Sequence, residues 1–135
     1  MKIAGIITEY NPFHNGHAYQ IEKVRQETGS DYVVIVMSGD FVQRGEPAML
    51  DKYVRAHMAL ENGADLVLEL PVAFACAGAE YFARGGVSIL NSLGCIDTLC
   101  FGTEQECLSD FEQVASLLSR EPVDFQQQLL SYLKK

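Results

Sequence analysis

The sequence predicts an α/β protein whose parallel β-sheet is covered by helices on both faces. Four short apolar stretches alternate with segments of helical spacing along the 135 residues, and strands separated by helices pair in parallel. The stretches are apolar almost throughout, which is typical of strands buried on both faces. Polar, glycine-bearing loops follow the strands, at the edge where open parallel sheets bind ligands.

The four strands are predicted from runs of apolar residues that end at polar or turn-forming residues. The first run stops at Thr8-Glu9, and the third stops at Pro71, which cannot donate to a strand ladder. The second run is β-branched in its middle, which favours a strand. The predicted strands cover residues 2–7, 32–37, 65–70 and 97–101.

The helices are predicted from apolar residues three and four positions apart. The first contains Ala18, Ile21 and Val24 at this spacing and is followed by Gly29, which suits a helix end. Asn62-Gly63 ends the second in the same way. The predicted helices cover residues 17–27, 50–61, 76–93, 104–119 and 125–133, the third of them containing Gly78, Gly85 and Gly86.

Length and composition predict one compact domain over residues 1–135. No apolar stretch approaches the roughly 20 residues that span a bilayer, and the N-terminus reads as a strand rather than a signal peptide. We therefore expect a cytoplasmic protein with no membrane contact. The chain ends within an unfinished amphipathic pattern, which suggests that the domain is truncated at its C-terminal end.

The net charge of −8 is unevenly distributed along the chain. Residues 1–60 hold six Lys or Arg and seven Asp or Glu, a balance of −1, and residues 61–135 hold four and eleven, a balance of −7. Phosphate contacts require clustered Lys and Arg, so the chain by itself makes a poor nucleic-acid binder. If the protein acts on nucleic acid, the basic surface lies elsewhere or in the set Arg44, Lys52 and Arg55.

The four cysteines predict neither a disulfide framework nor a zinc site. They are Cys76, Cys95, Cys100 and Cys107, and no two form a C-x-x-C pair. We expect buried, reduced thiols that act as small hydrophobic side chains.

The segment TEYNPFHNGH, residues 8–17, concentrates unusual chemistry directly after the first strand. His14 and His17 are three apart at the start of the first helix, so they project to one side of its first turn. That turn also presents unpaired N–H groups and the positive end of the helix dipole, which together form an anion site. Gly16 has no Cβ, so a ligand can approach the backbone there. This arrangement suits the phosphates of a nucleoside triphosphate, with both histidines donating as charge develops.

Two other interpretations of the histidines stay open. The first is a metal site, which would need a third ligand, and Glu9 is the one obvious addition. The second is that the histidines only pack or cap the helix. We favour phosphate binding and expect no protein-held metal at the histidines, with Mg²⁺ carried mainly by phosphate oxygens and water.

The loop SGDFVQRGEP after the second strand is predicted to contact substrate. Arg44 lies between Gly39 and Gly45, where it could approach a phosphate or carboxylate with both nitrogens. Asp40 and Gln43 would lie beside it. The alternative is an ordinary surface loop with an Arg44–Glu46 ion pair. In the helix that follows, Lys52 and Arg55 could add a phosphate contact or form a solvated face, and His57 is an ordinary helix residue.

Long stretches of the chain resemble one bacterial family. NPFHNGH resembles the H-x-G-H motif of the nucleotidyltransferase superfamily, although Asn11 stands where Asp is typical. The stretches GIITEYNPFHNGHAYQI, VMSGDFVQRGEPAMLDKYVRAHMAL, GADLVLELPVAFACAGAEYFARGGVSIL and IDTLCFGTE resemble the bacterial tRNA(Met) cytidine acetate ligase family. The resemblance covers residues 1 to about 104 and implies a Rossmann-like nucleotidyltransferase fold.

The family resemblance implies a ligase that joins acetate to ATP and transfers acetyl from acetyl-adenylate to N4 of the wobble cytidine of elongator tRNA(Met). It implies a longer chain with a later Ser/Arg-rich nucleotide motif and most tRNA contacts beyond this sequence, so this segment alone would be impaired. Two alternatives remain: a small-molecule adenylyl- or cytidylyltransferase, or a nucleotide- or RNA-binding module without turnover. The nucleotide site implied by the resemblance consists of Ile7, Thr8, Glu9, Tyr10, Asn11, Pro12, Phe13, His14, Asn15, Gly16, His17, Ala18, Tyr19, Gln20 and Gly102.

Overall fold

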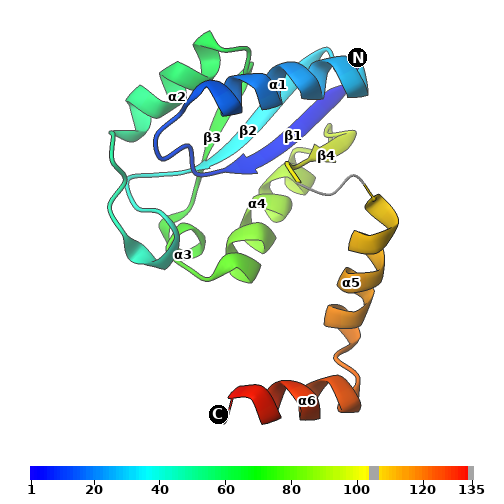
Figure 1. The fold of residues 1–135 in the computed structure, drawn as a ribbon. Coiled ribbons are helices and arrows are strands. Elements are labelled where there is room, and N and C mark those ends of the chain that lie inside the picture. Colours follow the sequence, from blue (N-terminus) through cyan, green and yellow to red (C-terminus); the bar gives the residue numbers. More distant parts are fainter. Residues whose placement is uncertain (104–106, 134–135) are drawn as a thin grey trace. The chain divides into compact units, whose positions relative to one another are not determined.

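The computed structural model describes residues 1–103 and 107–133 and divides the chain into two compact units, Met1–Gly102 and Thr103–Lys135. The first unit contains a four-stranded sheet in the order β3-β2-β1-β4, with β1 (Ile3–Thr8), β2 (Tyr32–Ser38), β3 (Leu66–Leu70) and β4 (Thr98–Cys100). All neighbouring strands are parallel. The predicted strands and the predicted interior position of the first strand are confirmed (Figure 1).

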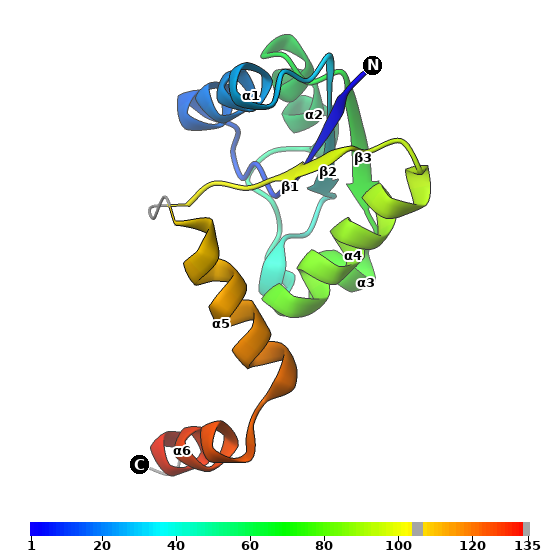
Figure 2. The same cartoon turned by 90° about the vertical axis from the view of Figure 1, so that its right-hand side faces the viewer.

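Helices cover both faces of the sheet, as the uniformly apolar strands predicted (Figures 1 and 2). Helices α1 (Asn15–Thr28) and α2 (Lys52–Glu61) contribute Ile21, Val24 and Ala59 to one core. Helices α3 (Val72–Ala75) and α4 (Ala79–Leu93) contribute Phe82 and Leu90, among others, to the core on the opposite face. The α/β fold with a parallel sheet between two helical layers is therefore confirmed.

The ends of the helices follow local signals in the sequence. Gly29 ends α1 with a φ of 64°, a left-handed conformation that glycine adopts without strain. Asp51 begins α2, and its Oδ1 accepts from Tyr53 N–H at 2.7 Å. The single helix predicted over residues 76–93 is wrong in its first part, because the chain forms the short α3 after Pro71 and starts α4 only after Gly78.

Gly86 of α4 is required by packing. A Cβ added there would lie 2.6 Å from Cγ2 of Ile7 in β1, too close for any real contact. We expect Gly86→Ala to lower the free energy of unfolding by about 1–2 kcal/mol, because overpacking costs about 1–3 kcal/mol and the gain in helix propensity offsets at most about 1. Urea unfolding of the variant beside Ser88→Ala, an exposed site on the same helix, measures this. A stabilised Gly86→Ala variant would contradict the contact.

The second unit consists of two helices, α5 (Leu108–Arg120) and α6 (Val123–Leu133). Both helices were predicted, although residues 104–106, where the first was expected to begin, lie outside the described residues. The prediction that residues 1–135 form one domain stays a prediction.

The cysteine prediction is wrong on burial. Cys95 and Cys107 are exposed and Cys76 and Cys100 are partly buried, and all four are free thiols. Three of them have apolar neighbours in the sequence, but an apolar neighbourhood along the chain does not place a side chain inside the core.

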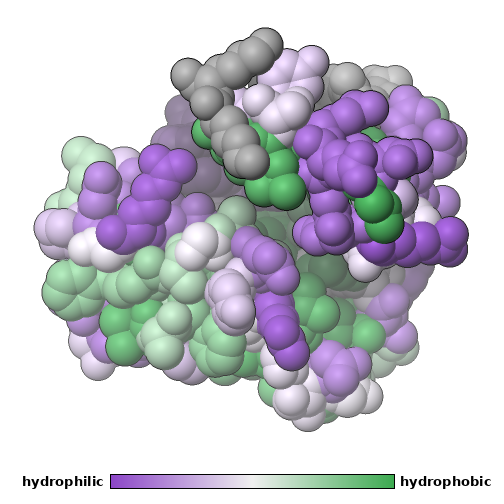
Figure 3. All heavy atoms as spheres, turned by 90° about the horizontal axis from the view of Figure 1, so that it is seen from below, coloured by the Kyte–Doolittle hydropathy of each residue, from purple (hydrophilic) through white to green (hydrophobic). Residues whose placement is uncertain are grey.

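The described part of the chain contains no helix long and apolar enough to cross a membrane. Hydrophilic residues interrupt the apolar ones over the face of the molecule drawn in Figure 3.

Candidate functional site

The sheet order places the loop after β1 at a topological switch point. From β1 the chain continues to β2 on one side, while β4 joins β1 on the other side. Ligands of open parallel sheets bind at such a point, beyond the carboxyl ends of the strands. His14 and His17 follow β1, and Gly102 follows β4, so the two predicted parts of the site share this edge. An added Cβ on Gly102 would lie 3.7 Å from Nε2 of Gln20, which brings the segment after β4 beside α1.

His14 and His17 form a reciprocal cap at the start of α1. Nδ1 of His14 accepts from the N–H of Gly16 at 3.1 Å, and Nδ1 of His17 accepts from the N–H of His14 at 3.3 Å. This is a capping box in which imidazole nitrogens replace the usual hydroxyl and carboxylate oxygens. Both histidines therefore cap the start of α1, and the phosphate-binding role stays a prediction.

Capping uses only Nδ1 of each ring and leaves the two Nε2 atoms available to a ligand. Because Nδ1 accepts in each ring, a neutral imidazole must carry its hydrogen on Nε2, which makes Nε2–H a donor. The rings of His14 and His17 stack with centroids 3.7 Å apart and 24° between their planes. Burial, and then the proximity of His14, lowers the pKa of His17. The free site thus presents two stacked rings whose Nε2–H groups can donate to a ligand, and capping and phosphate binding are compatible roles.

Gly16 is explained by the ring of His14. A Cβ at position 16 would lie 2.9 Å from Cε1 and 3.1 Å from Nδ1 of His14. The side chain of any other residue would push the ring out of its cap. The sequence suggested instead that glycine makes room for a ligand, and the structure provides a more immediate reason.

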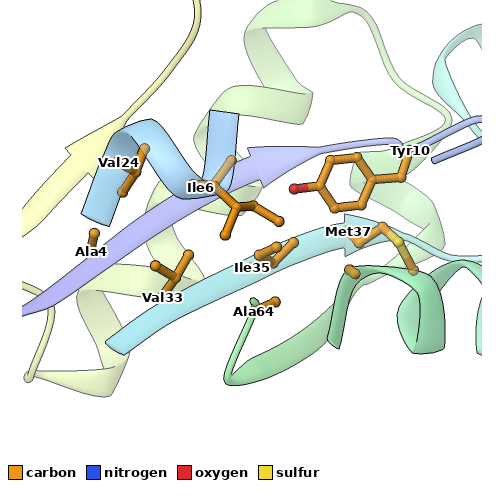
Figure 4. Close-up of a cluster of buried hydrophobic side chains, with 10 residues drawn as sticks. Ala4, Ile6, Tyr10, Val24, Val33, Ile35, Met37 and Ala64 are labelled. Carbon is orange, nitrogen blue, oxygen red and sulfur yellow. The ribbon is translucent and has the colours of Figure 1, made fainter. Parts of the chain in front are cut away.

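Tyr10 supports the site from inside the core (Figure 4). Its side chain is 1% exposed and packs in the core of the α1 and α2 face, with its ring centroid 4.6 Å from that of His17. Burial raises the pKa of Tyr10, and its hydroxyl has no hydrogen-bond partner among the described residues. The ring of Tyr10 thus orients His17 and is not exposed to a ligand.

The remaining residues of the predicted nucleotide site differ in exposure. Asn11 has a structural contact, since its Oδ1 accepts from the N–H of Met49 at 2.7 Å. Ile7 packs against the core of the opposite face. The exposed members are His14, Asn15, Gly16, Tyr19 and Gly102, and the partly buried ones are Ile7, Thr8, Glu9, Asn11, Pro12, Phe13, His17, Ala18 and Gln20.

The loop after β2 is hydrogen-bonded to the loop after β1. The N–H of Gln43 donates to Oε1 of Glu9 at 2.8 Å, so the carboxylate considered as an additional metal ligand already has a partner. Arg44 is exposed with a φ of 67°. The Arg44–Glu46 ion pair of the alternative interpretation is not formed in the described chain. The Nζ of Lys52 lies 3.6 Å from Oδ2 of Asp40, which places Asp40 beside α2.

Arg55 is a structural residue that the sequence analysis missed. It is fully buried, so the expectation of a phosphate contact or a solvated face is wrong. Its guanidinium donates to the carbonyl oxygen of Glu9 at 2.7 Å and to that of Ser38 at 3.1 Å. It also donates to the carbonyls of Leu50 and Gly39. Arg55 therefore joins the ends of β1 and β2, a role that no local signal in the sequence indicates.

The chain belongs to the HIGH nucleotidyl transferase family. The family model described as HIGH Nucleotidyl Transferase matches residues 1–135. It is 49% identical over 135 residues to a tRNA(Met) cytidine acetate ligase of Clostridium novyi (strain NT) and 53% identical to that of Caldicellulosiruptor saccharolyticus. Each alignment covers 100% of this chain and 34% of the relative. The chain thus spans about a third of the length of these relatives.

Solved structures agree with this family. Thermotoga maritima TmcAL bound with alpha-thio ATP superposes with a TM-score of 0.89 at 46% identity, covering 99% of this chain and 32% of that one. The apo form of the same protein gives a TM-score of 0.90 with the same coverage. The nucleotidyltransferase fold implied by the family resemblance is therefore confirmed.

Proposed function

We propose that this chain is the ATP-binding part of a ligase that makes acetyl-adenylate and transfers the acetyl group to N4 of the wobble cytidine of elongator tRNA(Met). The observation that carries the proposal is the stacked pair His14 and His17 at the helix start beside the switch point. The names of the relatives support the reaction, and the alpha-thio ATP in the Thermotoga maritima structure supports the nucleotide. We place this activity in the cytoplasm.

In the first step, an acetate oxygen attacks the α-phosphorus of ATP. The bond from that phosphorus to the bridging oxygen breaks, and pyrophosphate leaves with the electron pair. Acetate is a weak nucleophile, so the protein must align it and stabilise charge on the phosphates. The Nε2–H groups of His14 and His17 would donate to phosphate oxygens, and the N-terminus of α1 adds its dipole. The loop from Ile7 to Gln20 and Gly102 would surround the nucleotide.

Magnesium fits this site as an ion held mainly by the substrate. Glu9 is the single carboxylate between β1 and His14, and the N–H of Gln43 occupies one of its oxygens. Phosphate oxygens and water would supply most of the ligands, as is usual for Mg²⁺. The ion would neutralise charge on the triphosphate.

In the second step, the lone pair of the cytidine amino group attacks the carbonyl carbon of acetyl-adenylate. The bond from this carbon to the phosphate oxygen breaks, AMP leaves, and the amino nitrogen loses a proton. Residues 61–135 carry a balance of −7, which disfavours RNA binding by this part of the chain. We therefore propose that most tRNA contacts belong to the two thirds of the family's length that this chain does not cover.

Exchange of labelled pyrophosphate into ATP tests the proposal. We expect exchange by this chain to depend on acetate and to be weaker than that of the Clostridium novyi relative assayed in parallel. Propionate, other carboxylates and phosphoesters serve as competing substrates. Exchange stimulated by a phosphoester and not by acetate would replace the ligase with a small-molecule nucleotidyltransferase. ATP binding without any exchange in either protein would indicate a module without turnover.

A further inference from the structure

A cavity to which the proposed function assigns no role lies beside the proposed ATP site. A surface cavity of about 210 Å³ opens at the carboxyl ends of β2 and β3, against the start of α2. Its apolar wall includes Met37, Ala56 and Val67, and its polar groups include Lys52 and Glu69. Tyr53 also lines it, with a side chain that is 75% exposed.

The polar groups of this cavity place a donor and an acceptor side by side. Nζ of Lys52 lies 2.9 Å from both carboxylate oxygens of Glu69 and 3.6 Å from Oδ2 of Asp40. One positive and two negative charges give the group a balance of −1, which disfavours a small anion such as acetate. The Lys52–Glu69 pair is partly exposed, so exchanging it for a ligand of matching polarity costs little.

We propose that this cavity receives the cytosine ring of the acceptor nucleotide, an assignment that rests on the proposed function. The exocyclic amino group donates to Glu69, as carboxylates accept from cytosine N4 elsewhere. The unprotonated ring nitrogen beside it accepts from Lys52. The apolar wall contacts one part of the ring, and the exposed ring of Tyr53 offers a stacking surface, the usual means of holding an unpaired base.

The strand register places this cavity close to the nucleotide loop. Met37 pairs with Thr8 of β1 on one side and with Glu69 of β3 on the other. With neighbouring strands about 4.8 Å apart, Glu69 lies roughly 10 Å from the start of the loop that contains the histidines. An amino group bound at Glu69 is thus within reach of an acyl group formed on the adjacent nucleotide. Arg55 holds the backbone of both regions through the carbonyls of Glu9 and Ser38.

Nucleosides without phosphate test this assignment, because they avoid the histidine site. We expect cytidine to bind this chain about 5–150-fold more tightly than uridine, whose edge presents a carbonyl oxygen in place of the amino group. Chemical-shift changes in the methyl groups of Met37 and Ala56 measure the binding. Glu69→Met and Lys52→Met should each remove the preference for cytidine, and Glu61→Met, at the exposed end of α2, should keep it.

The same measurements separate this proposal from the ligase function. His17→Gln should keep cytidine affinity while pyrophosphate exchange falls. If the unmodified chain and its relative show no acetate-dependent exchange but this chain still prefers cytidine, the result counts against the ligase function and not against the cavity assignment. Equal binding of cytidine and uridine, or a Glu69→Met variant that keeps the preference, would overturn the cavity assignment. Adenosine shares the amino group and ring nitrogen, so adenosine that binds as tightly and displaces cytidine would also overturn it. That result would assign the cavity to the adenine of ATP.

Discussion

Replacing His17 by glutamine is expected to abolish most adenylate formation while leaving the fold intact. The glutamine side-chain oxygen can accept from the N–H of His14, as in an ordinary capping box, so the start of α1 stays stable. The variant loses the Nε2–H donor next to His14. Removing one such donor from developing charge lowers rates by about 10²–10³-fold. The rate of acetate-dependent pyrophosphate exchange and the urea midpoint, measured on the same samples, give the two results.

His57→Gln is the matched control for this experiment. His57 lies on α2, is largely exposed and pairs with Glu61 at 3.2 Å, far from the nucleotide loop in sequence. The His57→Gln variant should change neither the rate of pyrophosphate exchange nor the urea midpoint. His17→Ala should lower the rate of pyrophosphate exchange and also remove the part of the cap that His17 provides. Unchanged exchange in His17→Gln, or a requirement for added Zn²⁺ in the unmodified chain, would disprove the phosphate-binding role.

Replacing Arg55 by methionine is expected to cause a large loss of stability, about 3–5 kcal/mol. Methionine fills much of the space of the arginine stem, but it leaves the carbonyls of Glu9 and Ser38 buried without a donor. Each such carbonyl costs about 1–3 kcal/mol when it is left without a donor, so losing the donor to both accounts for a total of this size. Since domains of this size are stable by about 5–15 kcal/mol, the variant should unfold at a much lower urea concentration.

Two further variants show whether geometry or charge is responsible. Arg55→Lys keeps the charge, but a single ammonium cannot span the carbonyls that the planar guanidinium reaches, so we expect an intermediate loss. Arg84→Met, at an exposed position on α4, should cost little. An Arg55→Met variant as stable as Arg84→Met would show that Arg55 does not hold the ends of β1 and β2 together.

Much of the fold was predictable because it depends on local pattern. Apolar runs punctuated by Pro71 and Asn62-Gly63 located the strands and helices, and parallel pairing follows from their alternation. Parallel strands end at one edge, so the loop containing His14 and His17 had to lie there. The break between α3 and α4 was missed because Gly78 is compatible with either a helix interior or a helix start.

The sequence by itself therefore determined the α/β class, the location of the histidine loop and the family resemblance. Only the tertiary structure decided what individual side chains do at that edge. The local sequence around Arg55 predicts a surface cation. Only the folded chain brings the carbonyl of Glu9, 46 residues away, to its guanidinium. Lys52 and Glu69, 17 residues apart, become one polar pair only when α2 packs on β3. Burial and pairing depend on neighbours from distant segments, and a local pattern contains no information about which segments those are.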